Sequence, residues 1–135
     1  MKEITVNASL ENVAVVTSFV DEQLELLDAS VRAQAQIDVA IDELFSNIAY
    51  YAYPGSTGTA TIRFEAADDS MIRLSFIDQG VPYNPLEKED PDTGLPAAER
   101  PLGGLGIFLV KKTMDDLSYQ YIDGRNITTI TKTIR

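Results

Sequence analysis

Residues 37–52, IDVAIDELFSNIAYYA, constrain the fold of this chain more than any other segment. Their apolar positions recur three and four residues apart, which predicts an amphipathic helix with one face against a core. Glu43 and Asn47 are four residues apart, so they stack one turn above the other at the edge of the apolar stripe. A carboxylate and an amide placed there are able to face a ligand beside the helix. A solvated helix edge is the ordinary alternative for a single Glu-x-x-x-Asn.

The chain before this segment predicts a strand and a helix. Apolar residues alternate over 4–8, and a helical face follows through about residue 27, with Ser9 as its expected N-cap. Ser30 is the expected N-cap of a second helix over 31–51. That helix is expected to end before Pro54, because the residue preceding a proline disfavours the α conformation.

The chain after this segment predicts two hairpins with one helix between them. Strands are expected over 60–66 and 72–78 around a turn at 67–70, and over 119–122 and 127–134 around a turn at 123–126. The helix opens at Gly103, and its expected buried face is Ile107, Val110, Met114 and Leu117. This order predicts one α+β domain over residues 1–135, a two-layer sandwich with helices on one face of a mixed sheet.

Residues 81–102 break the periodicity. This stretch holds five of the six prolines and is acidic. A non-periodic segment of this length in a compact domain is a lid, a binding loop or a disordered segment, and composition does not decide between them.

Composition excludes several classes of function. The chain has no cysteine and no histidine, so disulfide frameworks, thiolate or imidazole metal sites and Ser-His triads are excluded. The net charge of −10 argues against nucleic acid and anionic membrane as partners. It favours a basic protein partner or simply provides solubility. No apolar run approaches the ~20 residues of a membrane span and no secretion signal is apparent, so we expect a cytoplasmic protein.

Two further motifs are candidates for ligand binding. Asp78 ends an apolar strand, where a partly buried carboxylate needs a donor such as a purine amino group, and Gly80 allows a sharp turn beside it. The run Gly103-Gly104-Leu105-Gly106 opens a helix, where free N–H groups and the positive dipole end attract anions. Each has an ordinary alternative, an Asp-Gln-Gly turn and a glycine-rich hinge. The glycine run is neither a Walker A loop nor a Rossmann fingerprint.

The combination is more specific than its parts. Glu43-Leu-Phe-Ser-Asn47 on a helix, Asp78-Gln79-Gly80 after a strand, a long lid and Gly104-Leu105-Gly106 opening a helix resemble, in this order, the N, G1 and G2 boxes of the GHKL nucleotide-binding superfamily. The match covers nearly the whole chain. The short length and the run GGLGIFLVKKTMDDLSY look most like the stand-alone bacterial anti-sigma-factor serine/threonine kinases. The resemblance implies the Bergerat ATP-binding fold with an ATP lid at about 81–102.

The resemblance implies a division of roles at the base end of the site. Asp78 would read the adenine amino group and Gly80 would shape the base pocket. A threonine in the last strand would support the adenine contact through water. Thr128 and Thr129 both qualify, and Thr129 is preferred.

The resemblance also implies roles at the phosphate end. Asn47 would hold Mg²⁺ against the phosphates of ATP, and Glu43 would be the general base. Backbone N–H groups of Gly103, Gly104, Leu105 and Gly106 would bind the phosphates. Arg100 would reach the terminal phosphate, whereas Lys111 and Lys112 are expected on a helix surface. The run Ala49-Tyr50-Tyr51-Ala52-Tyr53 departs from the small residue or histidine common in these kinases.

The implied function is ATP-dependent phosphorylation of a serine or threonine on a STAS-type anti-anti-sigma protein. Binding of a sigma factor and a homodimer through the first strand and helix would fit the same family. The alternative is a nucleotide-gated protein-binding module with little or no kinase activity, because every residue named above except Glu43 is equally needed for binding. A histidine kinase is disfavoured, since the chain has no histidine to accept phosphate in cis.

Overall fold

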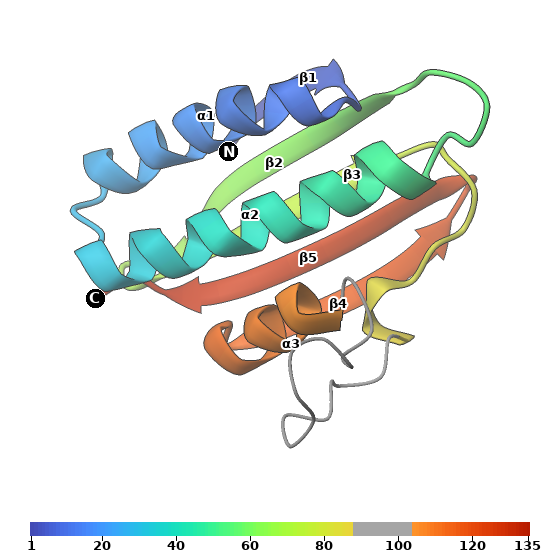
Figure 1. The fold of residues 1–135 in the computed structure, drawn as a ribbon. Helices are drawn as coiled ribbons and strands as arrows, with labels where there is room; N and C mark the ends of the chain where they lie inside the picture. The colour runs from blue at the N-terminus through green and yellow to red at the C-terminus, as the bar shows by residue number, and fades with distance from the viewer. Residues whose placement is uncertain (88–103) are drawn as a thin grey trace.

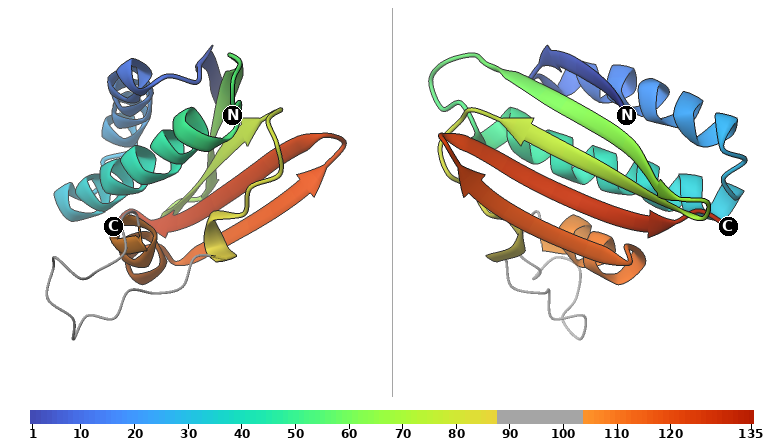
Figure 2. Two further views of the ribbon diagram at one scale, coloured as in Figure 1. Left: turned by 45° about the vertical axis from the view of Figure 1, so that its right-hand side comes forward. Right: turned by 180° about the vertical axis from the view of Figure 1, so that it is seen from behind.

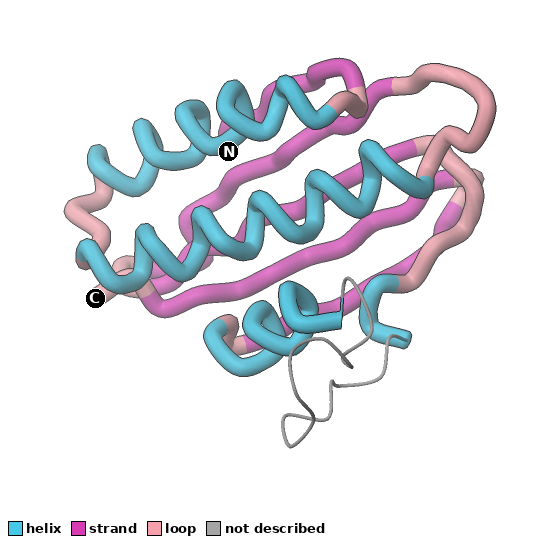
Figure 3. Tube along the Cα trace, viewed as in Figure 1, coloured by secondary structure: helices cyan, strands magenta, loops and turns pink. Residues whose placement is uncertain are grey.

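A computed structural model describes residues 1–87 and 104–135, which form two layers (Figure 1). Five strands make one sheet, and all three α-helices lie on the same face of it; the view from behind in Figure 2 shows the other face bare of helices. Figure 3 shows the same separation by colour. The predicted α+β sandwich with helices on one face is therefore confirmed.

The elements of the described residues are β1 Lys2–Asn7, α1 Val13–Leu26, α2 Val31–Tyr51, β2 Thr59–Asp68, β3 Met71–Asp78, α3 Gly104–Thr113, β4 Asp116–Ile122 and β5 Arg125–Thr133, with 3₁₀ helices at Leu10–Asn12 and Pro85–Glu87.

The sheet has the order β1-β2-β3-β5-β4 and is antiparallel at every pairing of these strands. The prediction of a mixed sheet was wrong. The chain runs from β1 through α1 and α2 to β2 and reverses direction at each connection between them. β1 and β2 therefore pair antiparallel. β4 runs in the direction of β3, but β5 lies between them and is antiparallel to both. This insertion places the start of β5 directly beside the end of β3.

The hairpin between β4 and β5 is tighter than predicted. Asp123 and Gly124 have φ angles of 55° and 76°, which is the left-handed conformation of both central residues in a type I′ turn. The turn is therefore two residues long, and Asn126, predicted to lie in it, belongs to β5. The shorter turn fixes which face of the sheet each β5 side chain occupies.

Helix boundaries follow the sequence except at two points. Ser30 caps α2 as predicted, its Oγ accepting from the Ala33 N–H at 3.1 Å. Ser9 instead precedes a 3₁₀ turn and makes no side-chain cap, so α1 begins only at Val13. Leu117, predicted on α3, lies in β4, because α3 ends at Thr113.

The core lies between the helices and the sheet. Phe45 from α2 and Phe76 from β3 are its largest fully buried side chains. Ile107 and Val110 of α3 are buried as predicted, so the glycine-rich start of α3 is held against α2 by apolar packing. None of the helices in the described residues is long and apolar enough to cross a membrane.

Two acidic side chains meet where α1 packs on α2. Asp21 and Asp38 each have one carboxyl oxygen, Oδ1, that is buried and has no hydrogen-bond partner. Two carboxyl groups this close are able to share a hydrogen bond only if one of them carries a proton. Burial, this hydrogen bond and the charge of Asp21 together raise the pKa of Asp38 to about 7.

We expect this pair to make stability depend on pH. The pKa of Asp38 is higher in the folded chain than its ordinary value of 3.8, so the folded state binds more protons and the free energy of unfolding falls as pH rises from about 4 to about 7. The Asp38→Asn variant keeps a donor to Asp21 without needing a proton. It should be more stable than the wild type at pH 8 by about 1 kcal/mol, a value reduced for solvent screening.

Urea unfolding at pH 5 and pH 8 measures this difference. Asp42→Asn, an exposed change on the same helix, is the matched control and should leave the pH dependence unaltered. An equal decline in stability with pH in the wild type and in Asp38→Asn would rule out the shared proton.

Candidate functional site

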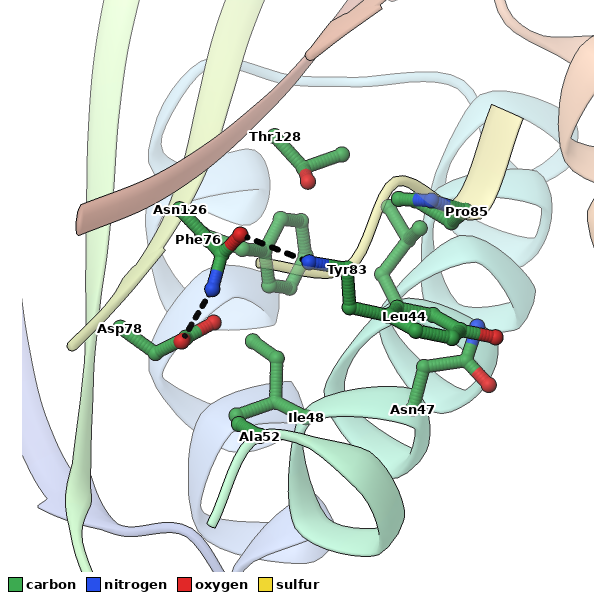
Figure 4. Close-up of a pocket in the computed structure, with 10 residues that line it drawn as sticks. All are labelled: Leu44, Asn47, Ile48, Ala52, Phe76, Asp78, Tyr83, Pro85, Asn126 and Thr128. Carbon is green, nitrogen blue, oxygen red and sulfur yellow. Dashed lines mark hydrogen bonds between the residues drawn. The ribbon is translucent and has the colours of Figure 1, made fainter. Parts of the chain in front are cut away.

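A pocket opens between the C-terminal half of α2 and the adjoining ends of β3 and β5 (Figure 4). The space among its side chains is about 340 Å³, including the part open to solvent. Its walls are mainly apolar, with a few polar groups at defined positions, which suits a flat, largely apolar ligand with polar edges. It is lined by Leu44, Asn47, Ile48 and Ala52 of α2, Phe76 and Asp78 of β3, Tyr83 and Pro85 after β3, and Asn126 and Thr128 of β5.

Asp78 and Asn126 form the polar end of this pocket. They stand opposite each other in the β3–β5 ladder, and both are buried, with 5% and 3% of their surface exposed. The Nδ2 of Asn126 donates to Asp78 Oδ1 at 2.8 Å and to the carbonyl of Val81 at 2.9 Å. Its Oδ1 accepts from the backbone N–H of Tyr83 at 3.1 Å and from the Tyr119 hydroxyl. One amide therefore ties β3, β4, β5 and the segment after β3 together.

The carboxylate of Asp78 has acceptor capacity left for a ligand. Oδ1 accepts hydrogen bonds from Asn126 Nδ2 and from the Gly80 N–H at 2.9 Å, and in Figure 4 the other oxygen points toward the interior of the pocket. Burial raises the pKa of Asp78, while these two hydrogen bonds lower it. A buried carboxylate with a free lone pair is suited to accept a hydrogen bond from an amino group on a flat ring.

Gly80 lets the segment after β3 lie directly on the end of α2. A Cβ at this position would be 2.1 Å from the carbonyl oxygen of Ala52, which no real side chain tolerates. Val81 N–H donates to the same carbonyl at 2.8 Å, and Gln79 N–H donates to the Tyr53 hydroxyl at 2.9 Å. The glycine is therefore needed for close approach of two backbones, and it forms the edge of the pocket beside Asp78.

Glu43 and Asn47 lie on α2 toward the start of α3. The Nδ2 of Asn47 donates to Glu43 Oε1 at 3.4 Å, and Asn47 is buried at the pocket wall. A Cβ at Gly106 would be 2.0 Å from Glu43 Oε2, so the first turn of α3 has room for this carboxylate only because residue 106 is glycine. The structure thus brings two of the predicted motifs into contact, and the third meets the same helix at Ala52.

These contacts define the two ends of the site along α2. Glu43 and Ala52 are nine residues apart, which is about 13 Å along a helix at 1.5 Å per residue. The buried carboxylate of Asp78 lies toward one end of this span, and Glu43 with the N-terminus of α3 lies at the other. A helix N-terminus presents free backbone N–H groups to anions. The site is therefore suited to a ligand with a ring at one end and an anionic group at the other.

Thr128, and not Thr129, faces the pocket. Side chains alternate along β5, and Thr128 is buried on the face of Asn126, where it lines the pocket. Thr129 is on the opposite face, its hydroxyl 3.1 Å from that of Ser75. The geometry therefore favours Thr128 over Thr129, the residue preferred from the sequence, and the role of this threonine stays a prediction.

An aromatic pair covers the side of the pocket away from the sheet. The ring of Tyr83 stacks on Tyr51 of α2, with centroids 5.0 Å apart and planes at 22°. The tyrosine that departs from the pattern of the resembled kinases therefore supports a pocket-lining ring. Tyr83 and Pro85 were not predicted as site residues, since they lie in a stretch without periodicity.

Several predicted site residues are not placed by the structure. Arg100, Gly103 and most of the predicted lid lie outside the described residues. Gly104 and Leu105 are the first two residues of α3. Lys112 is exposed as predicted, its ammonium 5.4 Å from the Phe108 ring centroid.

The donor set near Asn47 fits a hard cation held mostly by its ligand. The described residues contain no cluster of three or more His, Asp or Glu side chains suited to hold a metal alone. Mg²⁺ bound to a nucleotide needs only one or two protein oxygens, the rest coming from phosphates and water. The side-chain oxygen of Asn47 is able to meet this requirement.

Sequence reasoning missed Asn126, whose amide hydrogen-bonds to Asp78, Tyr119 and the segment after β3. The signal was present in Asp123-Gly124, a dipeptide typical of two-residue hairpins. With that turn, Asn126, Thr128 and Ile130 alternate onto the core face, and an asparagine among buried positions requires partners.

Comparison with known proteins agrees with this geometry. A family model described as "Histidine kinase-like ATPase domain" matches residues 6–132. A Bacillus mycoides protein named "Serine-protein kinase RsbW" is 27% identical over 129 residues, covering 93% of this chain and 80% of that protein. A Bacillus cereus protein of the same name is 31% identical over 93 residues, and the match spans 66% of this chain and 58% of that protein.

Solved structures share the fold. The RsbU and RsbW domains of a Mycobacterium tuberculosis protein superpose with a TM-score of 0.68 at 18% identity, covering 99% of this chain and 33% of that one. The mycobacterial sensor histidine kinase MprB gives 0.58 at 20% identity, covering 98% of this chain and 99% of that one. The resemblance drawn from the three boxes is confirmed by these matches, whereas the role of each site residue stays a prediction.

The Asn126→Ala variant should be destabilised, because it leaves the buried Asp78 carboxylate and two backbone groups without their partner. We expect a loss of about 2–4 kcal/mol in the free energy of unfolding, measured by urea denaturation at pH 7. Asn12→Ala, which removes a partly exposed asparagine contact to the Asn7 carbonyl, is the control and should cost less than about 1 kcal/mol. Equal losses in the two variants would mean that Asn126 does not hold the site together.

Proposed function

We propose that this chain, which belongs to the histidine kinase-like ATPase domain family, binds Mg-ATP in the pocket and phosphorylates a serine or threonine of a protein partner. The observation that carries the proposal is the buried Asp78 carboxylate, directed into a pocket on α2, together with Glu43 of the same helix, which lies against Gly106 in the first turn of α3. The relatives named serine-protein kinase support the class of reaction and the amino acid modified. The chain spans little more than half of the Bacillus cereus relative, so activity and partners are proposed for this chain from its own site.

Asp78 and Thr128 would recognise the base. The free oxygen of Asp78 accepts a hydrogen bond from the adenine amino group, which guanine lacks at that position. Thr128, on the same face of β5, supports this contact directly or through water. Gly80 and Ala52 form the edge against which the ring lies, and Tyr83 closes the side away from the sheet.

Asn47, Glu43 and the start of α3 would serve the phosphates. Asn47 contributes an oxygen to Mg²⁺, and Gly104, Leu105 and Gly106 offer backbone N–H groups at the helix N-terminus. The metal ion supplies neutralisation of charge on the transferred group. Glu43 holds or accepts the proton of the attacking hydroxyl, and its hydrogen bond with Asn47 keeps its carboxylate at the phosphate end. Arg100 and Gly103 stay proposed phosphate contacts on sequence grounds alone.

The proposed partner is a STAS-type anti-anti-sigma protein, with a sigma factor as a second partner that phosphorylation would control. The proposed assembly is a homodimer through β1 and α1, where Val15 and Leu26 are exposed apolar residues. The proposed setting is the cytoplasm. The names of the RsbW relatives support this context, and the lack of cysteine is compatible with a reducing compartment.

The second candidate is a binding module that senses ATP without transferring phosphate. This module uses the same pocket. The contact of Glu43 with Gly106 favours this candidate if the carboxylate serves only to position α3. The two candidates differ in what Glu43 does, so the substitution of this residue separates them.

Nucleotide binding should depend on one face of β5 only. Calorimetric titration with Mg-ATP and Mg-GTP should show preference for ATP in the wild type. Asp78→Asn should abolish that binding, and Thr128→Val should weaken it by about tenfold, as loss of one hydrogen bond predicts. Thr129→Val, on the other face of the same strand, is the matched control and should bind like the wild type. Equal weakening by the two threonine variants would contradict the assigned pocket.

Glu43→Gln should separate transfer from binding. The amide keeps the size and a hydrogen bond to Asn47 but accepts no proton, so transfer from radiolabelled ATP to a copurified STAS-domain partner should fall by about 10²–10⁴-fold. The dissociation constant for Mg-ATP should stay within about threefold. Asp42→Asn, next to it on the exposed face of α2, controls for the charge change. Unimpaired transfer in Glu43→Gln would remove Glu43 from the chemistry, and nucleotide-dependent partner binding without transfer in the wild type would establish the second candidate.

A further inference from the structure

The end of the molecule away from the nucleotide pocket carries a cationic cleft. It lies between the start of α2, the end of α3 and the end of β5, which come together near the C-terminus in Figure 1. Its basic lining residues are Arg32, Lys112, Lys132 and Arg135, which are four of the eleven lysines and arginines in a chain of net charge −10. Asp115 is the one acidic residue in its lining.

Within residues 1–87 and 104–135, none of these four basic side chains forms a salt bridge. The salt bridges of the described residues join Arg63 to Glu3 and Arg73 to Glu65, so they involve none of the four. The ammonium of Lys132 donates to the Thr113 carbonyl, and Arg135 donates to carbonyls of the α1–α2 and β2–β3 connections. The guanidinium of Arg32 and the ammonium of Lys112 are on exposed residues. Asp115 interacts with Lys132 and offsets part of this positive charge, but four cationic side chains beside one carboxylate still favour a bound anionic group.

An apolar groove continues directly from this cleft. It lies between α2 and α3, is lined by Ala35, Val39, Leu109 and two residues shared with the cleft, Gln36 and Thr113, and exposes 47% of Val39 and 41% of Leu109. Val31, 87% exposed, precedes Ala35 and Val39 at intervals of four residues, so the three lie in one row on the outer side of α2. A contiguous apolar row beside an ionic cleft differs from singly scattered surface residues and is typical of a protein-binding surface.

We propose that the cleft and the groove together, the α2–α3 surface, dock an acidic protein segment that carries apolar anchor residues. The acidic side chains face Arg32, Lys112 and Lys132, and the anchors enter the groove at Val39 and Leu109. A free anion would leave the apolar groove unused, so the occupant carries both acidic and apolar groups. Arg32 and Leu44, the first pocket-lining residue of α2, are about 18 Å apart at 1.5 Å per residue, so the cationic cleft is separate from the nucleotide pocket.

The proposal is tested with a displayed library of random 16-residue peptides, selected on the wild-type chain and counter-selected on Lys112→Glu/Val39→Glu. Peptides that pass both steps should be rich in Asp and Glu with apolar residues spaced for one face. Their dissociation constants, measured by fluorescence anisotropy, should rise at least about tenfold in Lys112→Glu and in Val39→Glu taken singly. They should also rise with salt between 50 and 500 mM, as a screened ionic contact predicts.

Lys2→Glu, the same charge reversal at an exposed lysine on β1, is the matched control and should bind like the wild type. Circular dichroism and thermal unfolding confirm that each variant is folded. The proposal is overturned if no peptides are enriched, if the enriched peptides lack acidic residues, or if Lys2→Glu weakens binding as much as Lys112→Glu. It is also overturned if polyglutamate without apolar residues competes equally well, or if sedimentation shows that a second copy of the chain occupies the surface. Each of these measurements is made without nucleotide, so its outcome is independent of the kinase proposal.

Discussion

The hydrogen bonds of Asn126 are the interaction on which the rest of the site depends. A carboxylate that ends a buried strand is unfavourable unless donors surround it, and here the donors come from the strand beside it and from the turn that follows. The same amide orders the backbone that supports Tyr83. The acceptor that faces the pocket and the ring that covers it are thus positioned by one side chain, itself buried in the sheet.

Helix α2 provides the scale of the site. Its apolar stripe holds it on the sheet, and positions along the edge of the stripe meet different parts of the site. Glu43 lies against Gly106 of α3, Asn47 lines the pocket, and the carbonyl of Ala52 accepts from Val81. Two glycines make this arrangement possible, since Gly80 allows a loop and Gly106 allows a helix to approach α2 without a side chain between them. The proposed docking surface begins at the other end of the same helix, so one long element connects two regions that are each proposed to bind an anionic group.

Features of the fold and site that depend on local sequence were predictable, whereas features that depend on contacts between distant segments were not. Periodicity located α2 to the residue, because its pattern is long and regular, and it grouped Glu43 with Asn47. The spacing of the three boxes identified the family. Periodicity did not reveal that the sheet is antiparallel, since strand order is set by contacts between distant segments. Nor did it decide between Thr128 and Thr129, because the sequence did not show which face of β5 packs against the helices. Asn126 was missed because it was assigned to the turn, and the contacts of Tyr83 come from a stretch without periodicity.

The two-residue turn at Asp123-Gly124 has a consequence for how relatives of this chain are able to vary. Because β5 runs straight from the turn into the pocket, inserting or deleting a single residue there would rotate Asn126 and Thr128 out of the site and bring Arg125 and Ile127 into it. Adding one residue to β4 and one to β5 would preserve the pairing of Asp78 with Asn126 only if both were added between Asn126 and the turn. We therefore expect relatives to gain or lose residues at this hairpin in pairs, one on each strand. In an alignment, an even difference in the length of the hairpin would then indicate an intact base pocket.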